Sequence, residues 1–203
     1  MSGAAHWTNP PPFFSEKDGV LVVRTAAKTD FWSNTFYGYK TGNGHFYGRP
    51  VTGDFSAEAE FHADYRTLYD QAGLMLRVDD RTWLKTGTEF TDGAHHFSVV
   101  VTRDDQSDWS MMPLPGEPRT PVALRLTRHA EALRVQVREG GVWRLVRLAY
   151  LGAARVPVTD HLADALTTRL PHAQEDGDEG WCLGPSFPAD AIPAGRRPAP
   201  MLV

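Results

Sequence analysis

The stretch QAGLMLRVDDRTWLKTGTEF, residues 71–90, decides the fold of this chain. Within it, residues 71–78 and 83–90 alternate apolar and polar side chains on either side of a polar connection, a pattern typical of two paired β-strands. In the first segment one face is unbroken and apolar, consisting of Ala72, Leu74, Leu76 and Val78. In the second segment the better core set is Leu84, Thr86, Thr88 and Phe90. The stretch therefore predicts a β-hairpin with one face in a core.

The other face of this hairpin has an unusual composition. It comprises Gln71, Gly73, Met75, Arg77, Trp83, Lys85, Gly87 and Glu89. These residues share one side of a sheet only if paired residue numbers have an even sum, which a two-residue turn at 80–81 does not allow. Residues 79–82 also lack the glycine that tight primed turns prefer. We therefore predict an odd-length or bulged loop.

Two interpretations of this face are open: a solvated outer surface, or a concave surface that binds a ligand. Lys85 and Glu89 lie four residues apart on one strand, so about 13 Å separates their Cα atoms and each needs a cross-strand partner or a ligand. Trp83 and Gly87 are odd choices for a merely solvated strand. They favour the binding surface.

The same alternation recurs along the chain. It occurs in residues 20–25, 55–62, 97–103, 107–112, 121–128, 132–138 and 142–150. No amphipathic helical pattern precedes residue 150, so we predict an all-β fold in a sandwich of one domain, residues 1–151.

From residue 152 the pattern changes to proline-rich sequence. We expect residues 152–203 to form an atypical C-terminal segment, irregular or disordered from about residue 189. Residues 161–170 could form one or two helical turns. Residues 174–180 read as an acidic loop that lacks the spacing of a calcium site.

Composition excludes several classes of protein. The 203 residues carry 21 Lys and Arg against 25 Asp and Glu, a net charge of −4, which lacks the basic footprint of a nucleic-acid binder. No apolar run approaches the roughly 20 residues of a membrane helix. The single cysteine, Cys182, excludes a disulfide framework and a cysteine-based zinc site. With no secretory signal at the N-terminus, we expect a cytoplasmic protein with no nucleic-acid or membrane partner.

Four further residues are candidates for function. His45 lies in a glycine-rich loop among aromatic residues, where it either contacts a ligand as a donor or acid/base, or bonds the backbone structurally. Asp70 either caps a turn or orients Lys85 or His45. Trp32 and Trp109 offer indole rings, and Trp109 follows a carboxylate, Asp108. Adjacent His95 and His96 point to opposite sides of a strand, so we expect no metal site and no cofactor.

Several motifs occur in an order that resembles a known family. They are Asp30-Phe31-Trp32, Gly44-His45-Phe46, Tyr69 to Met75, the pattern Trp83-x-Lys85-x-Gly87-x-Glu89, Ser98 to Thr102, and Ser107 to Ser110. This order is similar to the DUF1349 family, also described as regulation-of-enolase-type proteins. The resemblance runs from about residue 7 to about residue 151. It implies a concanavalin A-like jelly roll of two curved antiparallel sheets with a concave face. Family members usually end in a further strand, for which residues 184–187 are the nearest counterpart.

Three functions follow as hypotheses. The first is a non-catalytic module that binds a saccharide or small polar metabolite, with Trp32, Trp83 and Trp109 for stacking and His45, Gln71, Lys85 and Glu89 for hydrogen bonds. The second is a glycoside hydrolase-like enzyme that uses Glu89 with Asp70 or Asp108. The third, suggested by the family's descriptive name, is a protein-interaction module that affects a metabolic enzyme. We favour the first, because the E-x-D-x-x-E strand motif of the superfamily's glucanases is absent.

Overall fold

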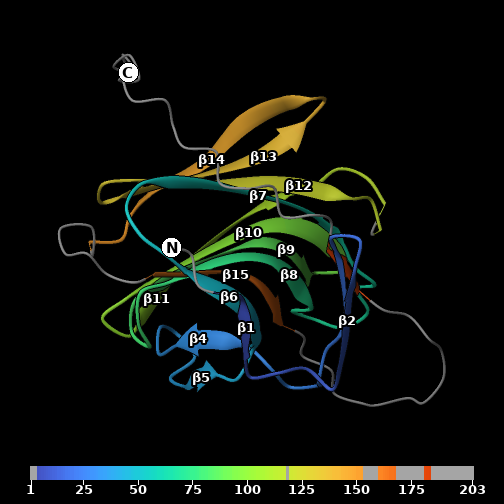
Figure 1. The fold of residues 1–203 in the computed structure, drawn as a ribbon, viewed down its shortest axis with the longest axis horizontal. Helices are drawn as coiled ribbons and strands as arrows, with labels where there is room; N and C mark the ends of the chain where they lie inside the picture. Colours follow the sequence, from blue (N-terminus) through green and yellow to red (C-terminus); the bar gives the residue numbers. More distant parts are fainter. Residues whose placement is uncertain (1–3, 118, 153–159, 168–180, 184–203) are drawn as a thin grey trace.

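The computed structural model describes residues 4–117, 119–152, 160–167 and 181–183, the last two ranges as backbone only. All regular elements in these ranges are β-strands, arranged as two seven-stranded antiparallel sheets and one two-stranded ribbon (Figure 1). The predicted all-β sandwich is confirmed. The described ranges contain no helix that could cross a membrane.

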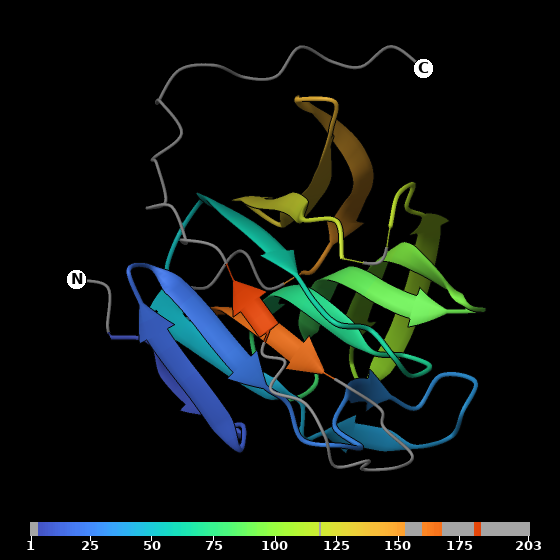
Figure 2. The same ribbon diagram turned by 90° about the vertical axis from the view of Figure 1, so that its right-hand side faces the viewer.

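One sheet, called the front sheet here, carries the hairpin of residues 71–90. Its strands in spatial order are β1 (His6–Thr8), β6 (His45–Val51), β15 (Asp160–Thr167), β8 (Gln71–Arg77), β9 (Trp83–Thr91), β10 (Ala94–Arg103) and β11 (Gln106–Pro113). The other, the back sheet, has the order β14 (Val142–Tyr150), β13 (Ala132–Glu139), β12 (Val122–His129), β7 (Phe55–His62), β16 (Trp181–Leu183), β3 (Val20–Arg24) and β2 (Phe13–Lys17). The two sheets face each other as layers (Figure 2).

The hairpin of β8 and β9 has the predicted register. Gln71 pairs with Glu89 and Gly73 with Gly87, so paired numbers have an even sum, and residues 78–82 form an odd-length loop. Both segments therefore place their alternate residues on common faces. Leu74, Leu76 and Leu84 enter the core between the sheets, as predicted.

A second apolar cluster lies on the other face of the front sheet. It comprises Phe31, Trp32, Phe46, Met75, Trp83 and Val100, with Tyr39 and Trp109 packed against it. The ribbon of β4 (Phe31–Ser33) and β5 (Lys40–Gly42) supplies part of this cluster. It lies beneath the front sheet, on the side away from β7 and β12 (Figure 1). This second layer makes a concave site possible, because it gives one face of the front sheet a wall.

The prediction of one or two helical turns within residues 161–170 was wrong. Residues 160–167 form β15, which lies between β6 and β8 and pairs antiparallel with both. Without it the backbone groups along β6 and β8 would face each other unpaired, and this two-sided ladder outweighs a weak local helical preference. A second late strand, β16, pairs with β3 and β7.

The boundary at residue 151 stays a prediction, although β15 and β16 pair with strands that precede it. The acidic loop at 174–180, the strand counterpart at 184–187 and the irregular tail from 189 lie outside the described residues.

Candidate functional site

A small recess opens where β8–β11 meet the β4–β5 ribbon. The front sheet contributes Gln71, Lys85, Glu89, Val100 and Trp109, and the segments at its rim contribute Asp30, Trp32, Tyr37, Tyr39 and Tyr69. Its volume is about 20 Å³, which holds one or two water-sized groups. Half of these residues are aromatic, and the charged and amide groups are Gln71 on β8, Lys85 and Glu89 on β9, and Asp30 just before β4.

A pair of glycines lets β8 and β9 approach each other closely beside this recess. Gly73 and Gly87 pair directly, between the Gln71–Glu89 pair and the Met75–Lys85 pair. A Cβ added to Gly73 would lie 2.0 Å from the Thr86 carbonyl oxygen, and one added to Gly87 would lie 1.9 Å from that of Ala72. Both contacts are with backbone, which cannot move aside, so the close approach of the two strands admits only glycine.

A buried ion pair forms one side of the recess. Lys85 Nζ donates to Asp30 Oδ1 at 2.8 Å, and the two side chains are only 7% and 10% exposed. Asp30 Oδ1 also accepts from the backbone N–H of Phe31 at 2.8 Å, and the Asp30 N–H is bonded by Asn43 Oδ1 at 2.9 Å. Gln71 Nε2 reaches the same oxygen at 3.4 Å. These bonds hold Lys85 and Asp30 in one geometry before any ligand arrives.

Glu89 is the least satisfied polar group of the recess. The residue is 5% exposed, and its Oε2 has no hydrogen-bond partner. Burial raises the pKa of this carboxyl, while the positive charge of Lys85 and a hydrogen bond with Ser98 act in the opposite direction. Glu89 can therefore accept a hydrogen bond from an incoming donor.

The aromatic walls are mutually perpendicular. Trp32 meets Tyr37 at a centroid distance of 5.5 Å and 75°, and meets Trp109 at 6.4 Å and 84°. Tyr69 meets Trp109 at 6.2 Å and 79°. A hydrogen bond with Tyr37 and partial burial raise the pKa of Tyr69 to about 12, so its hydroxyl stays protonated. Tyr37 is 41% exposed and stands at the mouth.

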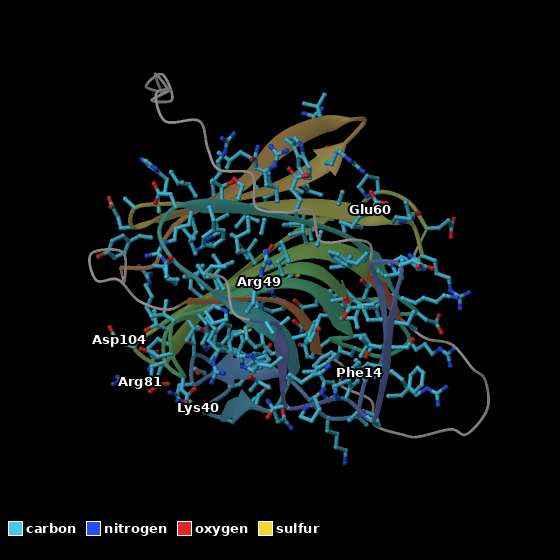
Figure 3. The ribbon with its side chains drawn as sticks, viewed as in Figure 1. Phe14, Lys40, Arg49, Glu60, Arg81 and Asp104 are labelled. Carbon is cyan, nitrogen blue, oxygen red and sulfur yellow. The ribbon has the colours of Figure 1, made fainter. Side chains whose placement is uncertain are left out.

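Charged contacts fasten this wall to the front sheet. Asp105, in the turn between β10 and β11, accepts from Lys40 of β5 and from Arg81 of the β8–β9 loop. Lys40, Arg81 and Asp104 gather at one corner of the molecule (Figure 3). Ser33 N–H also donates to Ser107 Oγ of β11 at 3.0 Å. The ribbon is thus tied directly to the β10–β11 turn and to β11, and through Asp105 to the β8–β9 loop.

Five residues that the sequence singled out line the recess together: Trp32, Gln71, Lys85, Glu89 and Trp109. Trp83 does not line it. That side chain is 2% exposed and packs edge-on against Phe31 at 6.2 Å, beneath the recess.

His45 does not line the recess either. Its Nδ1–H donates to the Asn9 carbonyl at 2.6 Å, and its Nε2 accepts from the Ala26 N–H at 2.9 Å. Burial lowers the pKa of this imidazole, which fits a neutral ring with both nitrogens in use. The geometry matches the structural alternative for His45.

Neither aspartate proposed as a catalytic partner of Glu89 lies among the recess residues. Asp70 Oδ2 accepts from the backbone N–H groups of Arg66 and Thr67, which caps the turn before β8. Asp108 accepts from Arg147 at 2.9 Å. Each directly precedes a recess residue, and the strand alternation turns Asp108 to the opposite face of β11.

The carboxylate that does join Glu89 in the recess is Asp30. Asp30 lies in one of the family motifs, but its role could not be read from the sequence, since no spacing relates residue 30 to residue 85. Tyr37, Tyr39 and Tyr69 were also missed. The aromatic residues of the stretch 31–47 hinted at the first two, and Tyr69 stood only at the start of a family motif. Within the described ranges, no three His, Cys, Asp or Glu side chains gather as a metal site.

The two facing antiparallel sheets define a β-sandwich with the concanavalin A-like fold. A fold match supports this class: a legume lectin-like domain from Entamoeba histolytica, with TM-score 0.56, 7% identity, and coverage of 93% of this chain and 90% of that one.

The chain belongs to the family described as "Protein of unknown function (DUF1349)", which it matches over residues 7–160. It is 40% identical to Regulation of enolase protein 1 of Saccharomyces cerevisiae over 156 residues, covering 76% of this chain and 75% of the relative. It also resembles the crystal structure of a functionally unknown Saccharomyces cerevisiae protein, with TM-score 0.78, 34% identity, and coverage of 93% and 97% of the two chains.

Proposed function

We propose that this protein binds a saccharide or a similar small polyhydroxylated metabolite at the recess, without chemical conversion. The observation that carries the proposal is the buried Glu89 Oε2, which has no partner in a recess walled by aromatic rings. Buried polar atoms are nearly always hydrogen-bonded, so an orphaned acceptor at a surface opening favours a ligand that brings a donor. The lectin-like fold match supports the same class of ligand by analogy.

The size of the recess fixes how much of the ligand enters. About 20 Å³ admits one hydroxyl or hydroxymethyl group. That group donates to Glu89, while Gln71 and the Lys85–Asp30 pair offer further donors and acceptors beside it. The sugar ring then lies at the mouth, against Tyr37 and Tyr69, because aromatic rings pack well on the C–H faces of sugars.

Hydrolysis has less support than binding. Retaining and inverting glycosidases need two carboxyl groups about 5–9.5 Å apart with the scissile bond between them. The recess carboxylates are Glu89 and Asp30, and Asp30 is held in an ion pair with Lys85 at 2.8 Å. The name of the yeast relative keeps a third function open, namely contact with a metabolic enzyme, and we retain it as an alternative proposal.

Titration calorimetry against a panel of mono- and oligosaccharides tests the proposal. We expect at least one ligand to bind the wild type, and Glu89→Gln and Trp109→Ala to weaken it at least tenfold. Glu131→Gln, an exposed substitution in the turn after β12, is the matched control and should leave affinity unchanged. A sugar that binds both recess variants as tightly as the wild type, or a panel with no binder, would refute the proposal.

A further inference from the structure

A second and larger cavity lies at one end of the interior between the two sheets. We call it the end cavity; its volume is about 270 Å³. It is lined from the front sheet by Thr88 and His95, from the back sheet by Val122 and residues 137–139, and from the connecting segment by residues 114–117 and 120–121. It shares no residue with the recess, since Thr88 and Glu89 are neighbours that face opposite sides of β9.

Five apolar side chains form the apolar part of the end-cavity wall. They comprise Leu114, Pro115, Pro121, Val122 and Val137. The charges at its rim are largely neutralised within the protein, because Arg138 pairs with Glu60 at 2.6 Å and Glu139 pairs with Arg144 at 2.9 Å. Glu60 lies near the end of β7, the central strand of the back sheet (Figure 3). Glu117 adds a further negative charge at the mouth, which disfavours an anionic ligand.

Two polar atoms of the lining, Thr88 Oγ1 and His95 Nε2, are buried without a hydrogen-bond partner. His95 is 8% exposed, and its Nε2 is buried without a hydrogen bond. Its ring lies 4.7 Å from Tyr65 and 5.3 Å from Phe90, which fixes its orientation. Burial and the neighbouring His96 lower the pKa of His95, so the ring is neutral at pH 7 and offers one hydrogen bond rather than a charge.

We propose that the end cavity is a second ligand site, which takes a small neutral amphipathic molecule of the phenol or arylalkyl alcohol class. Its hydroxyl bonds His95 Nε2, and its ring and carbon chain fill the space among Leu114, Val122 and Val137. The size fits, because an apolar cavity of about 150 Å³ already holds benzene. The requirement for neutrality follows from the paired rim charges and from Glu117, and the requirement for a hydroxyl follows from the unpartnered His95 Nε2, with Thr88 Oγ1 as a further polar atom in the lining.

Two-dimensional NMR of the whole chain tests this, with 2-phenylethanol as the probe and ethylbenzene as the probe that lacks the hydroxyl. We expect saturable shifts of the Val122 and Val137 methyls with 2-phenylethanol, and binding of ethylbenzene at least tenfold weaker. His95→Phe keeps the ring and removes the nitrogen, so it should cut the affinity for 2-phenylethanol at least tenfold and leave ethylbenzene unchanged.

Thr120→Trp provides a second variant that does not touch the interior. Thr120 is exposed at the rim, and an indole there should obstruct entry of both probes while the fold is kept. If 2-phenylethanol produces no shifts at Val122 and Val137, binds His95→Phe as well as the wild type, or binds Thr120→Trp unchanged, the proposal is wrong. Sugar binding at the recess is measured separately and does not depend on this result.

Discussion

Removing Lys85 should destabilise this protein far more than removing an exposed lysine in an ion pair of similar type. In Lys85→Met the Asp30 carboxylate stays buried beside Phe31 N–H and Gln71, but it loses the cation 2.8 Å away. With the two side chains 7% and 10% exposed, little water can replace that cation. Breaking one partner of a buried pair typically costs about 3–5 kcal/mol, so we expect the free energy of unfolding to fall by that amount.

The companion variants separate charge from packing. Asp30→Asn/Lys85→Met removes both charges and keeps an acceptor for the Phe31 N–H, so it should recover about 2 kcal/mol of the loss in Lys85→Met. The matched control is Lys40→Met, because Lys40 is 45% exposed in its ion pair with Asp105 and should cost at most about 1 kcal/mol.

Urea denaturation at pH 7, followed by tryptophan fluorescence and circular dichroism, measures these three variants, the single variant Asp30→Asn and the wild type. The reasoning fails if Lys85→Met loses no more than Lys40→Met. It also fails if the double variant is as unstable as the sum of its two single variants, since the pair would then carry no coupling.

Three other outcomes follow from the structure. Because the folded protein raises the pKa of Glu89 above its ordinary value of 4.5, the contribution of this carboxyl to stability is complete below about pH 4.5 and is lost as the pH rises through its folded pKa. Glu89→Gln should therefore gain stability relative to the wild type between pH 5 and pH 8 in urea titrations, and a flat difference would contradict the burial argument. Gly87→Ala should destabilise by more than about 2 kcal/mol, since its Cβ would meet the Ala72 oxygen at 1.9 Å. Gly42→Ala, whose Cβ would meet nothing within 4 Å, should cost less, and equal melting temperatures for the two variants would refute the close approach. Ala163→Pro should destabilise the protein by about 3 kcal/mol or more, because β15 is paired on both sides. Thermal melts and hydrogen exchange measure this effect. A variant as stable as the wild type would instead fit a helix that begins at residue 163, where proline is tolerated.

Local features of the chain determined the strands and the hairpin register. Side-chain alternation depends only on the geometry of an extended backbone, so it identified β7 to β14 without knowledge of their neighbours. The odd number of residues in the β8–β9 loop followed from the same rule, because a hairpin closes within a few residues. Lys85 and Glu89 were recognised for a similar reason. They lie too far apart on one strand to pair with each other, so each required a partner on another element or a ligand.

The partners of those residues depended on contacts between distant segments. Asp30 reaches Lys85 across 55 positions, and no periodicity encodes such a distance. The backbone groups of Asn9 and Ala26 that occupy His45 come from yet other segments, so its structural role was visible only once they were placed. β15 was missed for the same reason, because its strand conformation is stabilised by the open ladders of β6 and β8 rather than by its own sequence. Alternation acts between neighbouring residues, whereas hydrogen bonding and burial act between whichever surfaces the fold brings together.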